Sequence, residues 1–176
     1  MEIYFLRHAN AGNPKLDPRK DEQRPLDKQG MEQSHTVGQA LRRLKLKPGA
    51  IISSPLVRAR QTAEIVAQEL GLEKKLGIDD ALRPHASYAQ FEQLLARHRG
   101  KDAIVIVGHR PSQTEFLNQL VTGDPNGAVD FKKGAVVRVD KEDGKTAVLK
   151  WSMPPKVVGA LQHACASNSR PKTVRK

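Results

Sequence analysis

Three short apolar runs, each followed directly by polar residues, constrain the fold of this chain more than any other feature. Residues 3–6 lead into Arg7 and His8, residues 103–107 lead into Gly108 and His109, and residues 50–52 lead into Ser53 and Ser54. A strand buried on both faces is a continuous apolar run, and residues just past the carboxyl ends of parallel strands line a ligand crevice. The pattern therefore predicts a layered α/β protein with two histidines at one edge of its sheet.

Helical patterns alternate with these runs, as expected for a layered α/β domain. We expect helices to begin near Asp27, at Ser54 with Pro55 in the first turn, and near Pro111. Two further β-like runs, 135–139 and 147–151, flank a charged turn and predict a hairpin that completes the sheet. The polar segment 10–23 is long for a loop, which indicates a functional or mobile segment.

The length and composition indicate one domain. The chain has 176 residues, of which 38% are hydrophobic, and this is too short for two ordinary domains. We expect residues 1–162 to form that domain and residues 163–176, rich in Ser, Arg and Lys, to form a basic flexible tail. Cys165 is the only cysteine, and no apolar run has the length of a signal sequence or a membrane span. A cytoplasmic protein is the prediction.

The formal net charge of +11 favours anionic partners. Aromatic residues make up only 4% of the chain, too few for platforms that stack nucleic-acid bases. We therefore expect a phosphorylated protein or a small phosphorylated substrate, and neither a nucleic acid nor a membrane. The oligomeric state stays open.

The residues at the expected crevice suit a phosphoryl group. Arg7 and Arg58 supply rigid, permanently charged forks that match its oxygens, and Arg58 lies near a helix start, where free amides also attract anions. A neutral imidazole attacks phosphorus when its other ring nitrogen is held by an acceptor. On these grounds either His8 or His109 serves as the nucleophile, and the other supplies a further hydrogen-bond donor.

Three motifs resemble those of the histidine phosphatase superfamily, which is related to phosphoglycerate mutases. They are Leu6-Arg7-His8-Ala9, the stretch 53–63 with its Ser-Ser-Pro-Leu-Val-Arg start, and Gly108-His109-Arg110-Pro111. The short chain and the Arg24-Pro25-Leu26 element are most similar to SixA-type phosphohistidine phosphatases. The resemblance covers residues 1 to about 155.

That resemblance implies a three-layer α/β/α fold of the phosphoglycerate mutase type, with a central, mostly parallel sheet. It implies that His8 becomes phosphorylated, that Arg7, Arg24 and Arg58 bind the phosphate, and that His109 stabilises the transferring group. It implies no metal and no cofactor. The expected activity is that of a protein phosphohistidine phosphatase, and the alternative is a broad-specificity phosphatase of a small phosphorylated metabolite.

Two departures from the family pattern bear on the chemistry. Ala9 replaces a glycine, a small-for-small change of minor cost, and Ala81 stands where mutase-like relatives place an acidic proton donor. Asp80 and His85 are the remaining candidates for that donor. Because the P–N bond of phosphohistidine is labile, we expect a preference for phosphoramidates over alkyl phosphate esters.

Two alternatives come from other functional classes. The first is a zinc hydrolase with His8, His85 and His109 as ligands, against which the adjacent Arg7 and Arg110 argue by charge repulsion. The second is a binding module for nucleic acid or an acidic partner that acts through the basic tail. Removing the residues after Ala164 would abolish the function of such a module and spare the turnover of an enzyme.

Overall fold

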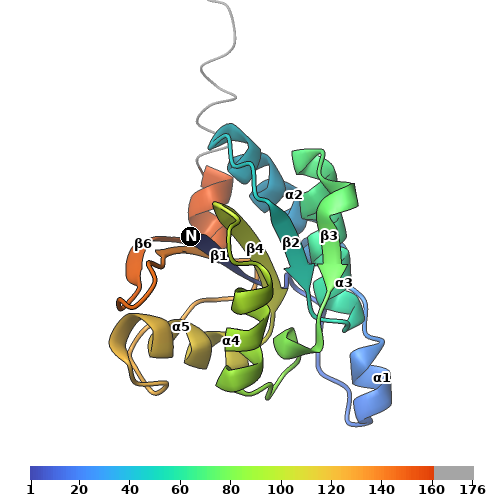
Figure 1. Cartoon of the computed structure of the whole chain (residues 1–176). Helices are drawn as coiled ribbons and strands as arrows, with labels where there is room; N and C mark the ends of the chain where they lie inside the picture. Colours follow the sequence, from blue (N-terminus) through green and yellow to red (C-terminus); the bar gives the residue numbers. More distant parts are fainter. Residues whose placement is uncertain (161–176) are drawn as a thin grey trace, which may run out of the picture.

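Six strands form one mixed sheet in the order β3-β2-β4-β1-β5-β6 (Figure 1). Their bounds are β1 Glu2–Arg7, β2 Ala50–Ser53, β3 Leu76–Ile78, β4 Ala103–Gly108, β5 Val136–Asp140 and β6 Val148–Met153. The four strands β3, β2, β4 and β1 are parallel, and β5 and β6 form the expected antiparallel hairpin beside β1. This computed structural model describes residues 1–160, so the tail predicted at 163–176 lies outside the described residues.

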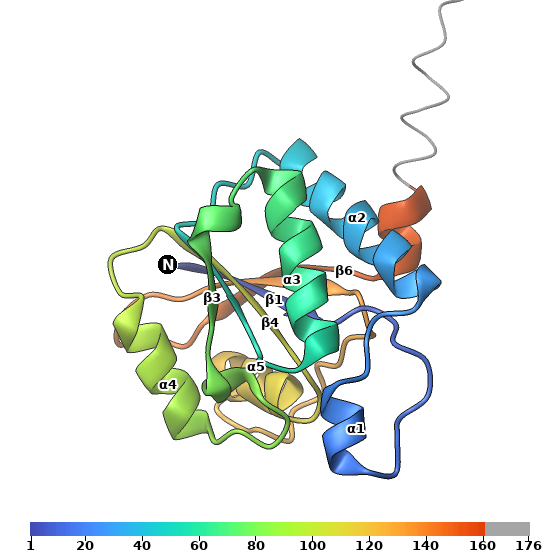
Figure 2. The ribbon, with the colours of Figure 1, turned by 90° about the vertical axis from the view of Figure 1, so that its right-hand side faces the viewer.

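Two helical layers cover the two faces of the sheet. Helices α2 Lys28–Arg43 and α3 Val57–Leu70 lie on one face, and α4 Tyr88–Arg97 and α5 Ser112–Thr122 lie on the other (Figure 1). The predicted three-layer architecture with a mostly parallel sheet is therefore confirmed. A short helix, α1 Pro18–Glu22, stands apart from both layers (Figure 2).

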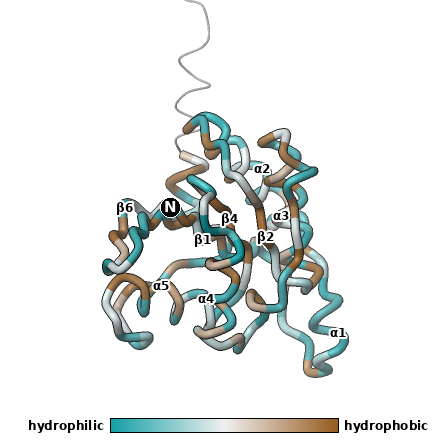
Figure 3. The backbone as a smooth tube through the Cα atoms, viewed as in Figure 1, coloured by the Kyte–Doolittle hydropathy of each residue, from teal (hydrophilic) through white to brown (hydrophobic). Residues whose placement is uncertain are grey.

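The central strands are apolar on both faces because each face has its own core. Along β1, Ile3 and Phe5 pack with α4 and α5, whereas Tyr4 and Leu6 pack with α2 and α3. All six residues of β4 are buried. Figure 3 shows this contrast between the apolar central strands and the hydrophilic α1.

Local signals set several helix ends. The Asp27 carboxylate caps α2 by accepting a hydrogen bond from the Gly30 amide at 2.8 Å, as predicted. The predicted first residue of α3, Pro55 after a Ser54 cap, is wrong by two residues. The helix begins at Val57 after Leu56, which makes no side-chain cap, and Ser54 bonds a histidine instead.

The strand β3 and the helix α1 have no counterpart among the predicted elements. The edge strand β3 has only three residues, and none of them is buried. The predicted loop at 10–23 contains α1, whose five residues are also all unburied. Neither segment carries the apolar periodicity from which elements are predicted. Within residues 1–160, no helix combines the length and the apolar character needed to cross a membrane.

Candidate functional site

The register of the sheet brings the two predicted histidines together. Arg7 of β1 pairs with Gly108 of β4, so His8 and His109 leave adjacent parallel strands at the same level. The His8 amide donates to the Gly108 carbonyl at 3.1 Å. The two imidazole rings have their centroids 5.0 Å apart, and both side chains are buried.

The hydrogen bond of His8 leaves one ring nitrogen free to attack. Its Nδ1 lies 2.7 Å from the Ala9 carbonyl oxygen, which only accepts hydrogen bonds, so Nδ1 carries the proton and Nε2 keeps its lone pair. Burial, together with the charges of Arg58 and Arg7, lowers the pKa of His8 to about 3 against the opposing effect of the Ala9 carbonyl. His8 is therefore a neutral imidazole near pH 7.

His109 is held by a serine on the neighbouring strand end. Its Nε2 lies 2.8 Å from the Ser54 hydroxyl, which also accepts from the Leu56 amide at 3.4 Å. We assign the hydroxyl as donor to Nε2, which places the ring proton on Nδ1, a buried nitrogen without a partner among the described residues. Burial and the neighbouring His8 lower the pKa of His109 to about 2, so this ring is also neutral.

Arg7 and Arg58 add positive charge to the site of the two histidines. Each guanidinium has an N–H group without a hydrogen-bond partner among the described residues. Arg7 Nη1 donates to the Phe131 carbonyl at 3.2 Å, and Arg58 Nη1 donates to the Asp21 carbonyl at 2.8 Å. The Nε atom of each guanidinium is buried without a partner among the described residues. Unpaired buried N–H groups are rare, and here they suit an anion that supplies acceptors from outside the chain.

Arg24 joins this group through a carboxylate. Its Nε donates to Asp21 at 2.9 Å, and a second oxygen of Asp21 lies 3.3 Å from Arg58 Nη1. Arg24 Nη1 also donates to the Ala11 carbonyl at 2.6 Å. The segment that carries Asp21 and Arg24, residues 12–25, is called the arm below, and the group Arg7, Arg24, Arg58, His8 and His109 is called the cationic cup.

The two predicted proton donors are placed elsewhere. The Asp80 side chain is 76% exposed, and its carboxylate forms an ion pair with Arg83 Nε at 2.6 Å. His85 is exposed and adopts a left-handed backbone conformation with φ of 64°. Neither makes a hydrogen bond or an ion pair with a residue of the cup. Ala81, at the position expected for the acid, is buried and apolar.

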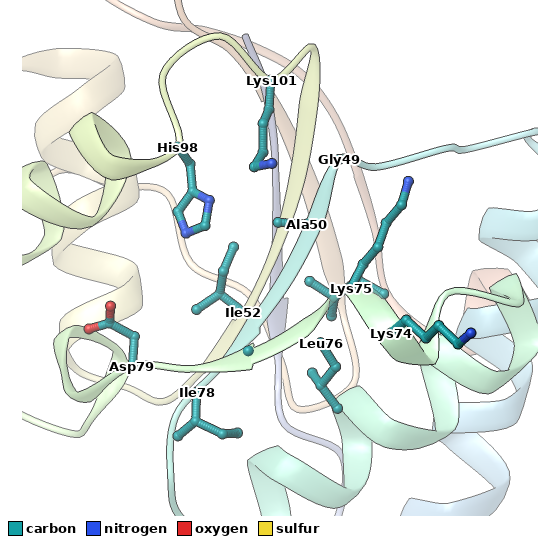
Figure 4. A pocket seen from close by; sticks show the side chains of 12 residues that line it. Gly49, Ala50, Ile52, Lys74, Lys75, Leu76, Ile78, Asp79, His98 and Lys101 are labelled. Atoms are coloured by element: carbon teal, nitrogen blue, oxygen red, sulfur yellow. The ribbon is translucent and has the colours of Figure 1, made fainter.

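A hollow at the edge of the sheet lies apart from the cup. Its volume is about 370 Å³. It is lined by residues of β2 and β3 and by the side chains of Lys74, Lys75, His98 and Lys101 (Figure 4). None of the cup residues lines it. Within residues 1–160, no group of three or more His, Cys, Asp or Glu side chains is arranged to hold a metal ion, so His8, His85 and His109 do not form the alternative zinc site.

Two polar residues of the site were missed or misread in the sequence. Ser54 was interpreted as a helix cap, but its hydroxyl bonds His109. Asp21 lies in a charged stretch without periodicity, so no pattern marks it as a site residue. The one available signal is its spacing of three residues from Arg24, at which helical turns form ion pairs.

The comparisons agree with the motifs. A family model described as histidine phosphatase superfamily (branch 1) matches residues 3–85. An uncharacterized protein of Picosynechococcus sp. (strain PCC 7002) is 36% identical over 140 residues, which are 78% of this chain and 83% of that protein. The phosphohistidine phosphatase SixA of Escherichia coli K12 is 24% identical over 157 residues, 88% of this chain and 94% of that protein.

The fold also matches a solved structure. The structure of the protein histidine phosphatase SixA complexed with tungstate superimposes with a TM-score of 0.78 at 23% identity. The match covers 89% of this chain and 98% of that one. At this level of identity the likeness establishes the shared fold, and the chemistry must be argued from the residues of the cup.

Proposed function

The chain belongs to the histidine phosphatase superfamily, and from that premise we propose that it is a protein phosphohistidine phosphatase that works through a phosphorylated His8. Membership of the superfamily implies phosphatase activity. One observation carries the choice of His8. Its Nδ1 is tied to the Ala9 carbonyl at 2.7 Å, so the lone pair on Nε2 is available to phosphorus.

The proposed reaction has two transfers. In the first, Nε2 of His8 forms a bond to phosphorus while the bond to the substrate imidazole breaks. That imidazole already carries a proton on its other ring nitrogen, so it leaves as a neutral ring. In the second, water attacks the phosphorylated His8, inorganic phosphate leaves, and Nε2 regains its lone pair. The free N–H groups of Arg7, Arg58 and His109 stabilise the charge on the transferring oxygens.

The missing proton donor supports a phosphoramidate substrate. Asp80 and His85 are the candidates for a general acid that the sequence offered, and among residues 1–160 neither makes a hydrogen bond or an ion pair with a residue of the cup. An alkoxide leaving group needs such an acid, whereas the ring of a phosphohistidine can carry a proton on its other nitrogen and then leaves as neutral imidazole without a strong acid from the protein. The likeness to SixA, whose solved structure holds the phosphate-like oxyanion tungstate, is a second support.

Trapping of the intermediate tests the proposal. A rapidly quenched reaction with a ³²P-labelled substrate should yield a labelled protein whose label is lost in acid and kept in alkali, as expected for a phosphoramidate. The H8A variant should take up no label, and the H35A variant, which removes an exposed histidine paired with Glu69, should be labelled like the wild type. Labelling of H8A at wild-type level would overturn the proposal.

A substrate panel separates the two candidate activities. Phosphohistidine proteins, free phosphohistidine and sugar phosphates should be compared by kcat/KM. A preference of 100-fold or more for the phosphohistidine proteins supports the proposed function. Equal turnover of sugar phosphates would favour the phosphatase of a small metabolite.

A further inference from the structure

A lysine that no sequence motif marks lies beside the cationic cup. The amide of Gly134 donates to the carbonyls of both Arg7 and His8, at 3.0 and 3.2 Å. The turn that carries Gly134 is closed by a bond from the Ala135 amide to the Lys132 carbonyl at 3.0 Å. Lys133 lies inside this turn, so its main chain is fixed directly against the strand end that presents His8.

The turn depends on the glycine that follows Lys133. Gly134 has φ of +70°, a conformation that L side chains rarely adopt, and a Cβ there would approach Gln33 and Pro155 at 3.3 Å. The glycine thus allows the main chain of this turn to approach the end of β1 closely enough for its hydrogen bonds to Arg7 and His8. The lysine before it is half-buried rather than extended into solvent.

The charges that act on Lys133 are mostly of its own sign. Burial lowers its pKa, and the positive charges of Arg7 from β1, Arg24 from the arm and Arg58 from α3 contribute to the lowering. The opposing charge is Asp27 at the start of α2, whose carboxylate is already bonded by the Asn10 side chain and the Gly12 amide. Among residues 1–160, Lys133 makes no ion pair with a carboxylate.

Like charges that act on one another across a site repel unless an anion lies between them. The backbone bonds of Gly134 hold Lys133 in place despite that repulsion, and the three guanidiniums are fixed by their own contacts. An anion with two negative charges removes the repulsion, and the phosphoryl group of the proposed substrate carries nearly that charge near neutral pH.

We propose that Lys133 is a further phosphate-binding residue, whose ammonium contacts an oxygen of the phosphoryl group that Arg7, Arg24 and Arg58 surround. This inference rests on the proposed function for the identity of the substrate, but not for the binding of a dianionic oxyanion. The role is one of charge, so arginine at position 133 should replace lysine, whereas an apolar side chain of similar length should not.

The pH dependence gives a readout that a merely structural role would not change. Because the neighbouring cations and burial lower the pKa of Lys133, its ammonium loses the proton at a lower pH than an ordinary lysine. Binding of the anion should weaken as the pH rises through that value. A guanidinium stays charged throughout this range, so K133R should lack the weakening.

The experiment measures tungstate binding by calorimetry, and kcat and KM with p-nitrophenyl phosphate, for the wild type, K133M, K133R and K132M. Lys132 is exposed and next in sequence, which makes K132M the matched control. K133M should raise the tungstate Kd and the KM about 10- to 100-fold, the value of one charge-assisted hydrogen bond, with kcat changed far less. K133R should lie within about threefold of the wild type, and K132M should be unchanged.

Three outcomes would overturn the inference. They are wild-type tungstate affinity in a folded K133M, an equal loss in K132M, or a K133R variant as weak as K133M with an unshifted thermal midpoint. Failure of the proposed function has a different signature. In that case the wild type turns over no phosphoryl substrate, while the tungstate titrations still report on Lys133.

Discussion

The cationic cup and the residues that support it include two groups that the chain holds in different ways. The first, called the strand half, consists of Arg7, His8 and His109 of the cup together with Ser54, which end or follow β1, β2 and β4; main-chain hydrogen bonds tie Arg7, His8 and Ser54 to neighbouring strands. The second group is the arm, where α1 has no buried residue and Leu16 is fully exposed. The Asp21 carboxylate joins Arg24 of the arm to Arg58 of α3.

This difference assigns catalysis to the strand half and substrate binding to the arm. A nucleophile must be held precisely, and buried strand ends in a packed core provide that rigidity. The arm is held by polar contacts at the surface, including the pair between Glu22 and Arg83 at 2.9 Å, and such contacts are individually weak. We therefore expect changes in the strand half to lower kcat and changes in the arm to raise KM.

The largest effect should follow from loss of the nucleophile. H8A should lower kcat by about 10⁴-fold or more, because the covalent route is then closed and only the binding groups remain. KM should change little, since the guanidiniums still bind the phosphoryl group. Steady-state kinetics with p-nitrophenyl phosphate checks this. A loss in kcat of tenfold or less would mean that His8 is not the nucleophile, and the strand half would then not be the catalytic part of the site.

The buried neutral imidazoles should make the fold sensitive to acid. The pKa of His8 is lowered to about 3 and that of His109 to about 2, whereas both have values near 6.5 in the unfolded chain. Between these values only the unfolded chain takes up the protons, so stability is full above pH 6.5 and falls as the pH drops below it.

Each histidine should lower the free energy of unfolding by about 1.4 kcal/mol between pH 7.5 and 5.5. Urea unfolding at the two pH values measures the change. The double variant H8N/H109N should show a smaller loss over the same interval, since it keeps the carboxylates and lacks the two rings. An equal loss in both proteins would show that the rings are protonated in the folded state.

The arm should affect binding more than chemistry. D21N removes the charge that gathers Arg24 and Arg58, and it should raise KM by about tenfold with kcat within threefold, the scale of one charged hydrogen bond. D143N, in the distant turn between β5 and β6, is the control. A fall in kcat without a change in KM would contradict the division of roles.

The sequence predicted the strand half well and the arm poorly, for a physical reason. A doubly buried strand has a continuous apolar pattern, so β1 and β4 and the residues after them could be located, and the parallel register then places His8 beside His109. The arm has no such pattern. The resemblance to the family suggested Arg24, but nothing in a charged loop indicated that Asp21 bridges two arginines.

Contacts between residues far apart in the chain could not be predicted from the sequence either. Ser54 precedes a proline at a helix start, where a cap is the usual role of serine, and only the neighbouring register of β2 and β4 brings its hydroxyl to His109. Lys133 lies in a turn whose position depends on two main-chain bonds to β1 and its following residue. Neither contact has a local signature.

Ser54 offers the mildest test of the strand half. If its hydroxyl donates to Nε2 of His109, it fixes the proton on Nδ1, where that ring can donate to a phosphoryl oxygen. S54A leaves the ring free to adopt the other tautomer and should lower kcat by about 2- to 10-fold, the value of one neutral hydrogen bond, without raising KM.

S53A is the matched control for S54A, because among residues 1–160 the Ser53 hydroxyl bonds only the main-chain carbonyl of Ser54. The ¹⁵N chemical shifts of His109 should show one neutral tautomer in the wild type and a mixture in S54A. A kcat loss with an unchanged tautomer would mean that Ser54 acts through packing. In that case the precision of the strand half comes from the sheet alone rather than from the hydroxyl that joins β2 to β4.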